Sequence, residues 1–397
     1  MRAVGTVVRG IRTPVIKSED DLGRIVIDSL MNAKEQEGFV FHDKDVVAIT
    51  EAVVGITEKN YVTLDQIATD IKNKIPSDEI GFIFPSPMSR NRFTPYLKGI
   101  ARAVSKITLQ IAYPGDEEGN KLFDESLLEK NNINPYSDVL TESEYQKLFG
   151  GKVHQFTGVD YIAHFREVVQ SENCEVEFIF ANNPKIILDY AEHIIVGNIH
   201  NRFKNSKILK ESGAKTVLGL HEIMNESVMG SGCNPEYGLL GSNRATDESL
   251  KLFPAKGQAL VESIQKELYE LTGKTIEVMV YGDGAFKDPV GGIWELADPV
   301  VSPAFTSGLV GTPNEIKLKY ISDNKLNDLK GQELIDAMKN EIKSKSANLV
   351  GDMASQGTTP RQITDLIGSL CDLTSGSGDK GTPVVFIQGY FDNYADE

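Results

Sequence analysis

The segment 375–382 reads Ser-Gly-Ser-Gly-Asp-Lys-Gly-Thr and has the composition of an anion-binding loop. Its glycines allow backbone angles that point successive N–H groups into one concavity, where a phosphate can bind. Lys380 could neutralise the phosphate charge. The predicted phosphate contacts are Ser375, Gly376, Ser377 and Gly378. A flexible connection between a helix and a strand is the alternative, and the motif G-x-x-x-x-G-K-[ST] does not occur in the chain.

Asp283 follows the apolar segment 276–281 and stands between two glycines, at the predicted end of a buried strand. Hard divalent cations such as Mg²⁺ and Mn²⁺ bind carboxylate oxygens, so we predict that Asp283 is a metal ligand. Asp247 and Glu248 could also reach a metal. The alternative for Asp283 is a turn aspartate that accepts hydrogen bonds from its own backbone.

Residues 234–244 form a long irregular segment that contains several side-chain donors, Asn243 among them. Such segments in compact domains are usually functional or disordered, and Tyr237 and two adjacent leucines argue against disorder. No nucleophile-centred motif surrounds any serine or cysteine, and no histidine pair has metal-ligand spacing on a helix. The chain therefore offers loops and carboxylates for chemistry, and no covalent nucleophile.

Apolar strands alternate with helices between about residues 76 and 222, a pattern typical of a parallel sheet covered on both faces. Each predicted strand precedes a polar turn, and ligands of such sheets bind beyond the carboxyl ends of the strands. These turns are either a binding edge or ordinary solvated connections. Strands are expected at 80–84, 107–113, 176–181, 193–196 and 216–220, and helices near 92–105, 158–170, 184–192 and 202–212.

The flanking segments, 1–75 and 223–397, differ from residues 76–222 because they contain long polar loops around a few regular elements. Strands are expected at 46–50, which ends at Glu51, and at 276–281 and 384–387. Helices are expected to begin after Ser18 as N-cap, to cover about 260–271 before Gly273, and to begin at Thr359-Pro360. The predicted fold class is α/β, with a mixed α+β core at 1–75 and 223–397 and an inserted doubly wound, mostly parallel, Rossmann-like domain at 76–222.

The composition limits the partners and the compartment. The formal net charge is −16 and the basic residues are scattered, which argues against nucleic acid and against an anionic membrane surface. Three cysteines without a C-x-x-C pair make neither a disulfide framework nor a zinc site. No apolar run approaches about 18 residues, and the start lacks the apolar stretch of a signal peptide, so a cytoplasmic location is expected.

Several short segments together resemble the coenzyme F420-0:gamma-glutamyl ligase family, over roughly 8–60 and 230–390. They are Arg12 to Ile16 followed by Asp20-Asp21-Leu22, Asp45 to Ile49, Gly238 to Asn243, Asp283, Asp365 to Leu373 and Pro383 to Gly389. Members use GTP with Mn²⁺ or Mg²⁺ to add glutamate to a deazaflavin precursor through an acyl phosphate. The resemblance implies a homodimer and a metal on Asp283. It also implies nucleotide contacts at Thr13, Pro14, Val15, Ile16 and Asn243, to which we add Glu51.

Three positions depart from the family pattern. A metal-binding aspartate of the family falls on Leu240, a lysine falls on Ile56, and an acidic residue of the closing helix falls on Leu366. The metal set is therefore rebuilt from other carboxylates or weakened, and the acceptor is expected to differ from the deazaflavin.

These observations lead to one functional hypothesis with two alternatives. The hypothesis is an amide ligase that uses GTP or ATP and Mn²⁺ or Mg²⁺ to join an amino acid, glutamate first, to a small-molecule carboxylate. Lys380 would neutralise phosphate charge, and Arg90 and Arg92 would hold a carboxylate. The alternatives are a metal-dependent phosphohydrolase and a nucleotide-binding regulatory protein without catalysis.

Overall fold

The computed structural model describes residues 3–84, 90–117, 121–150, 158–282, 286–287, 294–295, 301–355, 361–375 and 378–396. The chain divides into two compact units. Unit 1 comprises Met1–Val54, Lys256–Gly284 and Val300–Glu397, and unit 2 comprises Gly55–Ala255 and Ala285–Pro299. Within these described ranges, no helix has the length and apolar character needed to cross a membrane.

Unit 1 is built on a five-stranded mixed sheet in the order β1-β16-β2-β12-β15. Its central strands β2 (Val46–Thr50) and β12 (Glu277–Tyr281) are parallel, whereas β16 (Val384–Gln388) runs antiparallel to β2. The edge strands β1 (Val7–Ile11) and β15 (Ala304–Phe305) are antiparallel to their neighbours. The predicted strands at 46–50, 276–281 and 384–387 are confirmed, because five-residue apolar runs of this kind bury both faces.

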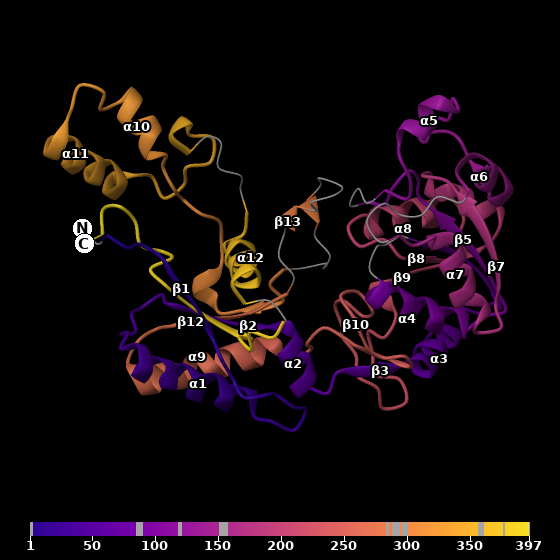
Figure 1. The fold of residues 1–397 in the computed structure, drawn as a ribbon, viewed down its shortest axis with the longest axis horizontal. Coiled ribbons are helices and arrows are strands. Elements are labelled where there is room, and N and C mark those ends of the chain that lie inside the picture. Colours follow the sequence, from indigo (N-terminus) through magenta and orange to yellow (C-terminus); the bar gives the residue numbers. More distant parts are fainter. Residues whose placement is uncertain are drawn as a thin grey trace. The chain divides into compact units, whose positions relative to one another are not determined.

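Helices cover both faces of this sheet. Helices α1 (Leu22–Glu37) and α9 (Gly257–Thr272) share one apolar cluster with the sheet, and α12 (Ile363–Ser375) packs on the opposite face (Figure 1). The N-cap of α1 is Asp21, whose carboxylate accepts from Arg24 N at 3.1 Å, so the prediction of Ser18 is wrong. Aspartate three residues closer to the helix satisfies the free N–H groups directly. The predicted cap Thr359-Pro360 lies outside the described residues.

A helical segment between β15 and α12 has a small core of its own. It contains α10 (Leu318–Asn324) and α11 (Gly331–Ser344), and their buried side chains pack with those of the chain's end, Ala395 included. This region was predicted to consist of long loops around a few regular elements. Helix α11 was missed, although its apolar residues recur at helical spacing.

Unit 2 contains a six-stranded sheet in the order β6-β7-β5-β4-β8-β9. All pairings among β4 (Glu79–Phe84), β5 (Lys106–Ile111), β7 (Glu175–Phe180), β8 (His193–Val196) and β9 (Thr216–Gly219) are parallel, and β6 (Leu140–Thr141) is antiparallel. The chain starts in the middle at β4, steps outward through β5 to β7, and returns to the other side for β8 and β9. This is the doubly wound α/β arrangement that the sequence predicts.

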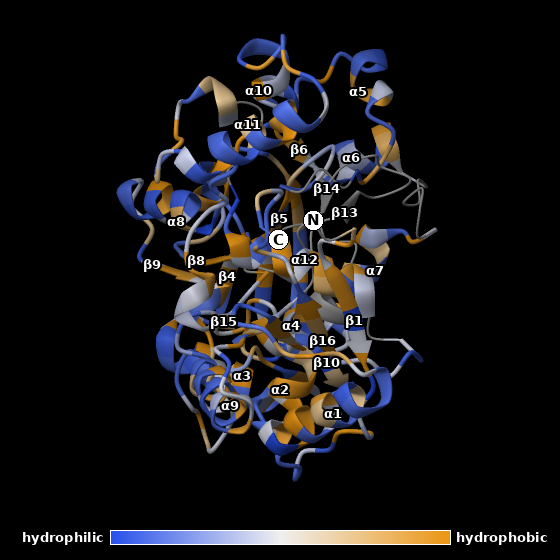
Figure 2. Ribbon diagram, turned by 90° about the vertical axis from the view of Figure 1, so that its left-hand side faces the viewer, coloured by the Kyte–Doolittle hydropathy of each residue, from blue (hydrophilic) through white to orange (hydrophobic). Residues whose placement is uncertain are grey.

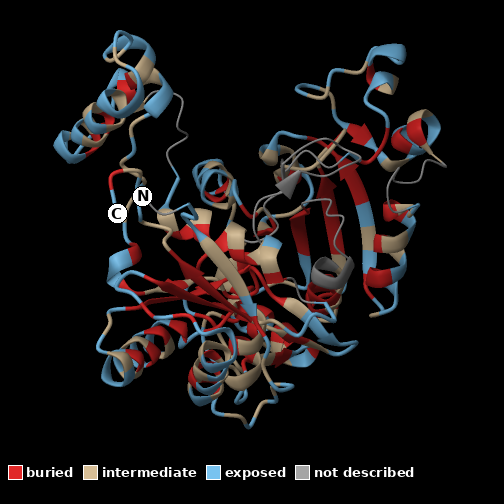
Figure 3. Cartoon of the chain, turned by 60° about the vertical axis from the view of Figure 1, so that its left-hand side comes forward, coloured by how far each residue is buried: buried red, intermediate tan, exposed pale blue. Residues whose placement is uncertain are grey.

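Apolar strands and covering helices make this sheet the interior of unit 2. Its strands are largely orange in Figure 2 and red in Figure 3, the colours of hydrophobic and of buried residues. One face packs against α3 (Leu64–Lys74), α4 (Arg90–Ala101) and α7 (Tyr161–Gln170). The other packs against η1 (Pro184–Asp189) and α8 (Arg202–Glu211). Shorter helices, α5 (Ser126–Lys130) and α6 (Glu142–Phe149), follow β5 along the chain.

A second, three-stranded sheet in unit 2 joins strands from the beginning and the end of the segment 55–255. It pairs β10 (Asn243–Thr246) with β11 (Ser249–Lys251), and β11 with β3 (Tyr61–Thr63). Residues 55–75 and 223–255 belong to unit 2, whereas the predicted boundaries placed both with the other domain. Pairing between strands so far apart in sequence leaves no local pattern from which it could be predicted.

The two ends of the segment 55–255 lie against each other within unit 2. Leu252 N donates to Asn60 O at 2.9 Å, and Ala255 N donates to the Glu58 carboxylate at 2.7 Å. The buried Asn60 amide also donates to Phe253 O at 2.6 Å. Three hydrogen bonds thus join the start of the segment to its end.

Candidate functional site

Four segments meet at one edge of the sheet in unit 1. Parallel β2 and β12 end together there, because Thr50 pairs with Tyr281. Antiparallel β16 begins at the same edge, since Val384 pairs with Ile49, and β1 ends there, since Ile11 pairs with Val384. We call this place the loop edge; it comprises residues 12–16, 50–51, 281–282 and 375–383 among those described.

Backbone hydrogen bonds join these segments. Thr13 N donates to Gly381 O at 3.3 Å, and Thr50 N donates to Pro383 O at 3.0 Å. The glycine-rich loop is therefore connected directly to the segment after β1 and to the end of β2. Thr382 Oγ1 is buried and has no hydrogen-bond partner among the described residues. Buried hydroxyls are normally hydrogen-bonded, so a water molecule or an ion is the expected partner of this one.

Glu51 is the buried carboxylate of the loop edge. It is the first residue of α2 (Glu51–Thr57) and only 7% of it is exposed. Glu51 directly follows the apolar strand β2, which ends at Thr50. A carboxylate at a strand end is an oxygen donor of the type that divalent cations bind.

Tyr281 and Ser375 form a buried hydroxyl pair that holds the start of the glycine-rich loop. Their oxygens are 2.5 Å apart, and each residue is 2% exposed. Burial raises the pKa of the Tyr281 phenol, so it stays protonated. Ser375 thus fixes the end of α12 to the end of β12. Tyr281 was not among the predicted site residues, although a tyrosine at the end of an apolar strand usually requires a partner for its hydroxyl.

The remaining loop-edge predictions differ in exposure. Thr13 is partly buried, whereas Pro14 is exposed and Val15 is 85% exposed. Ile16 packs against the apolar cluster beneath α1 and α9. Gly378 and Lys380 are exposed. Gly376, Ser377 and Asp283 lie outside the described residues, and the strand that precedes Asp283 ends at Tyr281.

A sequence model of the family described as F420-0:Gamma-glutamyl ligase matches residues 10–389. The chain belongs to this family. The match confirms the resemblance and also covers residues 61–229, which lie between the two stretches that carry it. No curated relative was found that matches the chain.

The other predicted site residues lie in unit 2. Asn243 is the first residue of β10, and Arg90 begins α4, just after the segment that follows β4. The side chains of Arg90 and Arg92 lie outside the described residues. Gly238, in the segment that resembles a family motif, has φ +51°, and a Cβ atom at this position would clash with the carbonyl oxygens of Leu220, His221 and Ile223. This segment is therefore fastened to the end of β9.

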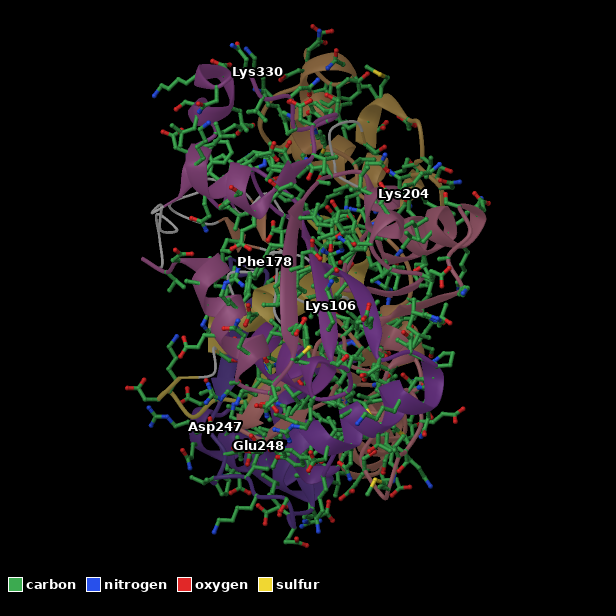
Figure 4. All side chains as sticks on the ribbon, turned by 90° about the vertical axis from the view of Figure 1, so that its right-hand side faces the viewer. Lys106, Phe178, Lys204, Asp247, Glu248 and Lys330 are labelled. Carbon is green, nitrogen blue, oxygen red and sulfur yellow. The ribbon has the colours of Figure 1, made fainter. Side chains whose placement is uncertain are left out.

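Asp247 and Glu248 lie on the exposed turn between β10 and β11 (Figure 4). Asp247 forms an ion pair with Arg244, and Glu248 pairs with Arg102 at 2.9 Å. A metal would have to compete with both arginines. Among the residues that the structure describes, no three His, Cys, Asp or Glu side chains are grouped so that they could hold a metal ion.

The family departures have structural consequences. Leu240, at the family's aspartate position, is 2% exposed and part of the main apolar cluster of unit 2. An aspartate there would bury a charge, so the leucine fits its surroundings in this chain. Ile56 and Leu366 are both partly buried, in α2 and α12.

Proposed function

We propose that the chain is an amide ligase that uses GTP or ATP, with Mn²⁺ or Mg²⁺, to join an amino acid to a small-molecule carboxylate. Membership of the gamma-glutamyl ligase family supports the reaction class and makes glutamate the first amine to test. The observation that carries the proposal is the loop edge, where the glycine-rich segment is bonded to Thr13 and Thr50.

The donors at this edge suit a nucleotide phosphate and a hard cation. Exposed Lys380 offers positive charge, Thr382 offers an unpaired hydroxyl among the described residues, and Glu51 offers a carboxylate. Glu51 and Asp283, which follow parallel neighbouring strands, would hold the cation. A bound divalent cation would neutralise phosphate charge, as cations do in other phosphoryl-transfer enzymes.

The reaction itself needs position and charge neutralisation more than a covalent nucleophile. A carboxylate oxygen of the acceptor attacks the γ-phosphorus, and the bond from that phosphorus to the β-phosphate oxygen breaks. The amine then attacks the acyl carbon, phosphate leaves with its C–O bond electrons, and the amine loses a proton. Arg90 and Arg92 would hold the carboxylate of the acceptor or of the amino acid.

Phosphate release tests this proposal. We expect slow release from nucleotide and Mn²⁺ alone, because an acyl phosphate must be kept from water until the acceptor is present. Adding glutamate and a metabolite extract should raise the rate and give a product with the mass of acceptor plus amino acid less water. Fast release without an acceptor would indicate a phosphohydrolase, and nucleotide binding without turnover would indicate a regulatory protein.

Binding and mutation test the site separately from the reaction. A nucleotide–metal pair at 100 times its dissociation constant should stabilise the protein by roughly 2.7 kcal/mol. Asp283→Asn should remove metal-dependent turnover and leave the circular dichroism spectrum unchanged, whereas Asp247→Asn, the matched control, should retain turnover. The reverse result would move the metal site to the turn between β10 and β11.

A further inference from the structure

A polar groove lies at the edge of the unit 1 sheet, between β1 and α1. Its volume is about 460 Å³, within the range of roughly 300–1,000 Å³ typical of small-molecule sites. Arg9 and Arg12 line the groove from β1 and the residue after it. Ser29, Asn32, Gln36 and Glu37 line it from α1.

The two arginines differ in how they are held. The Arg9 guanidinium donates to Gln388 Oε1 at 2.9 Å and lies 4.8 Å from the ring centroid of Phe39. These contacts fix its direction and leave other N–H groups free to donate. Arg12 is exposed and forms no ion pair or hydrogen bond with any residue that the structure describes. The Arg9 guanidinium is thus held in place before a ligand binds, whereas the Arg12 side chain is free to move toward a ligand.

The charge of the groove contrasts with that of the chain. Two arginines against Glu37 give the lining residues an excess of positive charge, in a chain of net charge −16. Such a local reversal concentrates anions. Two residues lie between the arginines, so about 10 Å of extended backbone separates their Cα atoms, which suits an elongated anion better than a compact one.

We propose that this groove binds an elongated small-molecule anion with at least two charged phosphate or carboxylate groups. Arg9 and Arg12 bind the two ends, and the polar side chains of Ser29 and Asn32 donate hydrogen bonds between them. Gln36 has less freedom, because its amide already donates to Asn32 at 2.9 Å. This inference does not depend on the ligase activity, since the groove-lining residues exclude Glu51, Asp283 and Lys380.

Calorimetric titration of the full chain in EDTA with inorganic tripolyphosphate and, separately, citrate tests the proposal. At least one of the two anions should bind, and the pair of probes distinguishes phosphate from carboxylate ligands. Arg12→Gln and Arg9→Gln should each weaken binding roughly tenfold, as expected for the loss of one charged hydrogen bond. Glu37→Gln should strengthen binding, because it removes the opposing charge.

Two control variants make the result specific. Lys266→Gln on α9 removes an exposed cation that, like Arg12, has no partner among the described residues and does not line the groove. It should leave affinity unchanged. The proposal is overturned if neither anion binds, or if Lys266→Gln weakens binding as much as Arg12→Gln. It is also overturned if only Lys380→Ala weakens binding, which would place the anion at the loop edge and support the proposed nucleotide site instead.

Discussion

The two units place their polar loops at strand ends by different means. In unit 2 the strands β4, β5, β7, β8 and β9 are all parallel, so the loops that follow them lie at the same end of the sheet. In unit 1 the loop edge needs two parallel strands and two antiparallel ones, drawn from residues about 10, 50, 280 and 380. The comparison shows that a regular repeat is visible in a sequence, whereas a site made of distant segments becomes visible only when the strands are paired.

Removing a core side chain from each unit tests whether the units are independent. Ile49→Ala in β2 and Leu109→Ala in β5 remove fully buried groups, so each should cost about 2–5 kcal/mol. Hydrogen exchange followed by mass spectrometry should show faster exchange only in the unit that carries the change. Val15→Ala, at an exposed position, is the control. Equal loss of protection in β2 and β5 from either variant would mean that the units unfold as one.

A partly buried ion pair in unit 2 can be removed without creating a cavity in the sheet. Lys74 Nζ donates to Asp70 at 2.8 Å and to Glu222 O at 2.7 Å. Lys74→Met leaves the buried Asp70 carboxylate with Met224 N as partner. We expect a loss of about 2 kcal/mol, less than for a fully buried pair because Lys74 is partly exposed.

Urea unfolding of the Lys74→Met variant should show this loss. Lys72→Met, two residues away at an exposed position of α3, should show little change. If both variants are equally stable, the pair contributes nothing measurable.

Removing a helix N-cap from each unit should have a smaller effect on stability, and one of similar size in both units. Asp21 caps α1 in unit 1, and Thr63 caps α3 in unit 2 through reciprocal bonds with Gln66. Asp21→Ala and Thr63→Ala should each cost about 1 kcal/mol, measured by thermal unfolding. Ser18→Ala should have almost no effect, because Ser18 is not the cap. An effect of Ser18→Ala as large as that of Asp21→Ala would contradict the assignment.

The smallest expected effect concerns pH. Burial, chiefly, lowers the pKa of His221 below its ordinary value of 6.5, with Arg202 and Lys210 adding to the shift. The unfolded chain then takes up a proton before the folded chain does. Unit 2 should therefore keep this stability above about pH 6.5 and lose it as the pH falls through the lowered pKa.

Urea unfolding at pH 7.5 and pH 5.5 measures this dependence, and His221→Gln should reduce it. An unchanged pH dependence in the variant would assign the effect to other groups.

The fold was predictable where the pattern is local. The strands at 80–84 and 193–196 are short apolar runs. Such runs arise because most of these side chains are buried, so they can be recognised in the sequence. The limits of unit 2 were not predictable, because they depend on β3 pairing with β11.

The site was predictable only in part. The glycine content of residues 375–382 predicted a binding loop. The backbone hydrogen bonds from Thr13 to this loop and from Thr50 to Pro383 were not predictable, because they depend on how the strands pair. The Tyr281–Ser375 pair joins residues 94 positions apart, so no spacing rule could find it.

The adjacent ends of the segment 55–255 affect how unit 1 folds. Strands β2 and β12 pair although more than 200 residues separate them, and closing so long a flexible loop would be entropically costly. Once unit 2 has folded, Leu252 and Ala255 are bonded to Asn60 and Glu58, so the loop between β2 and β12 is shortened to residues 51–58 and 255–276. We therefore expect β4 and β5 to gain protection before β2 and β12 in pulse-labelled hydrogen exchange during refolding. Earlier protection of β2 and β12 would show that unit 1 folds without the prior folding of unit 2.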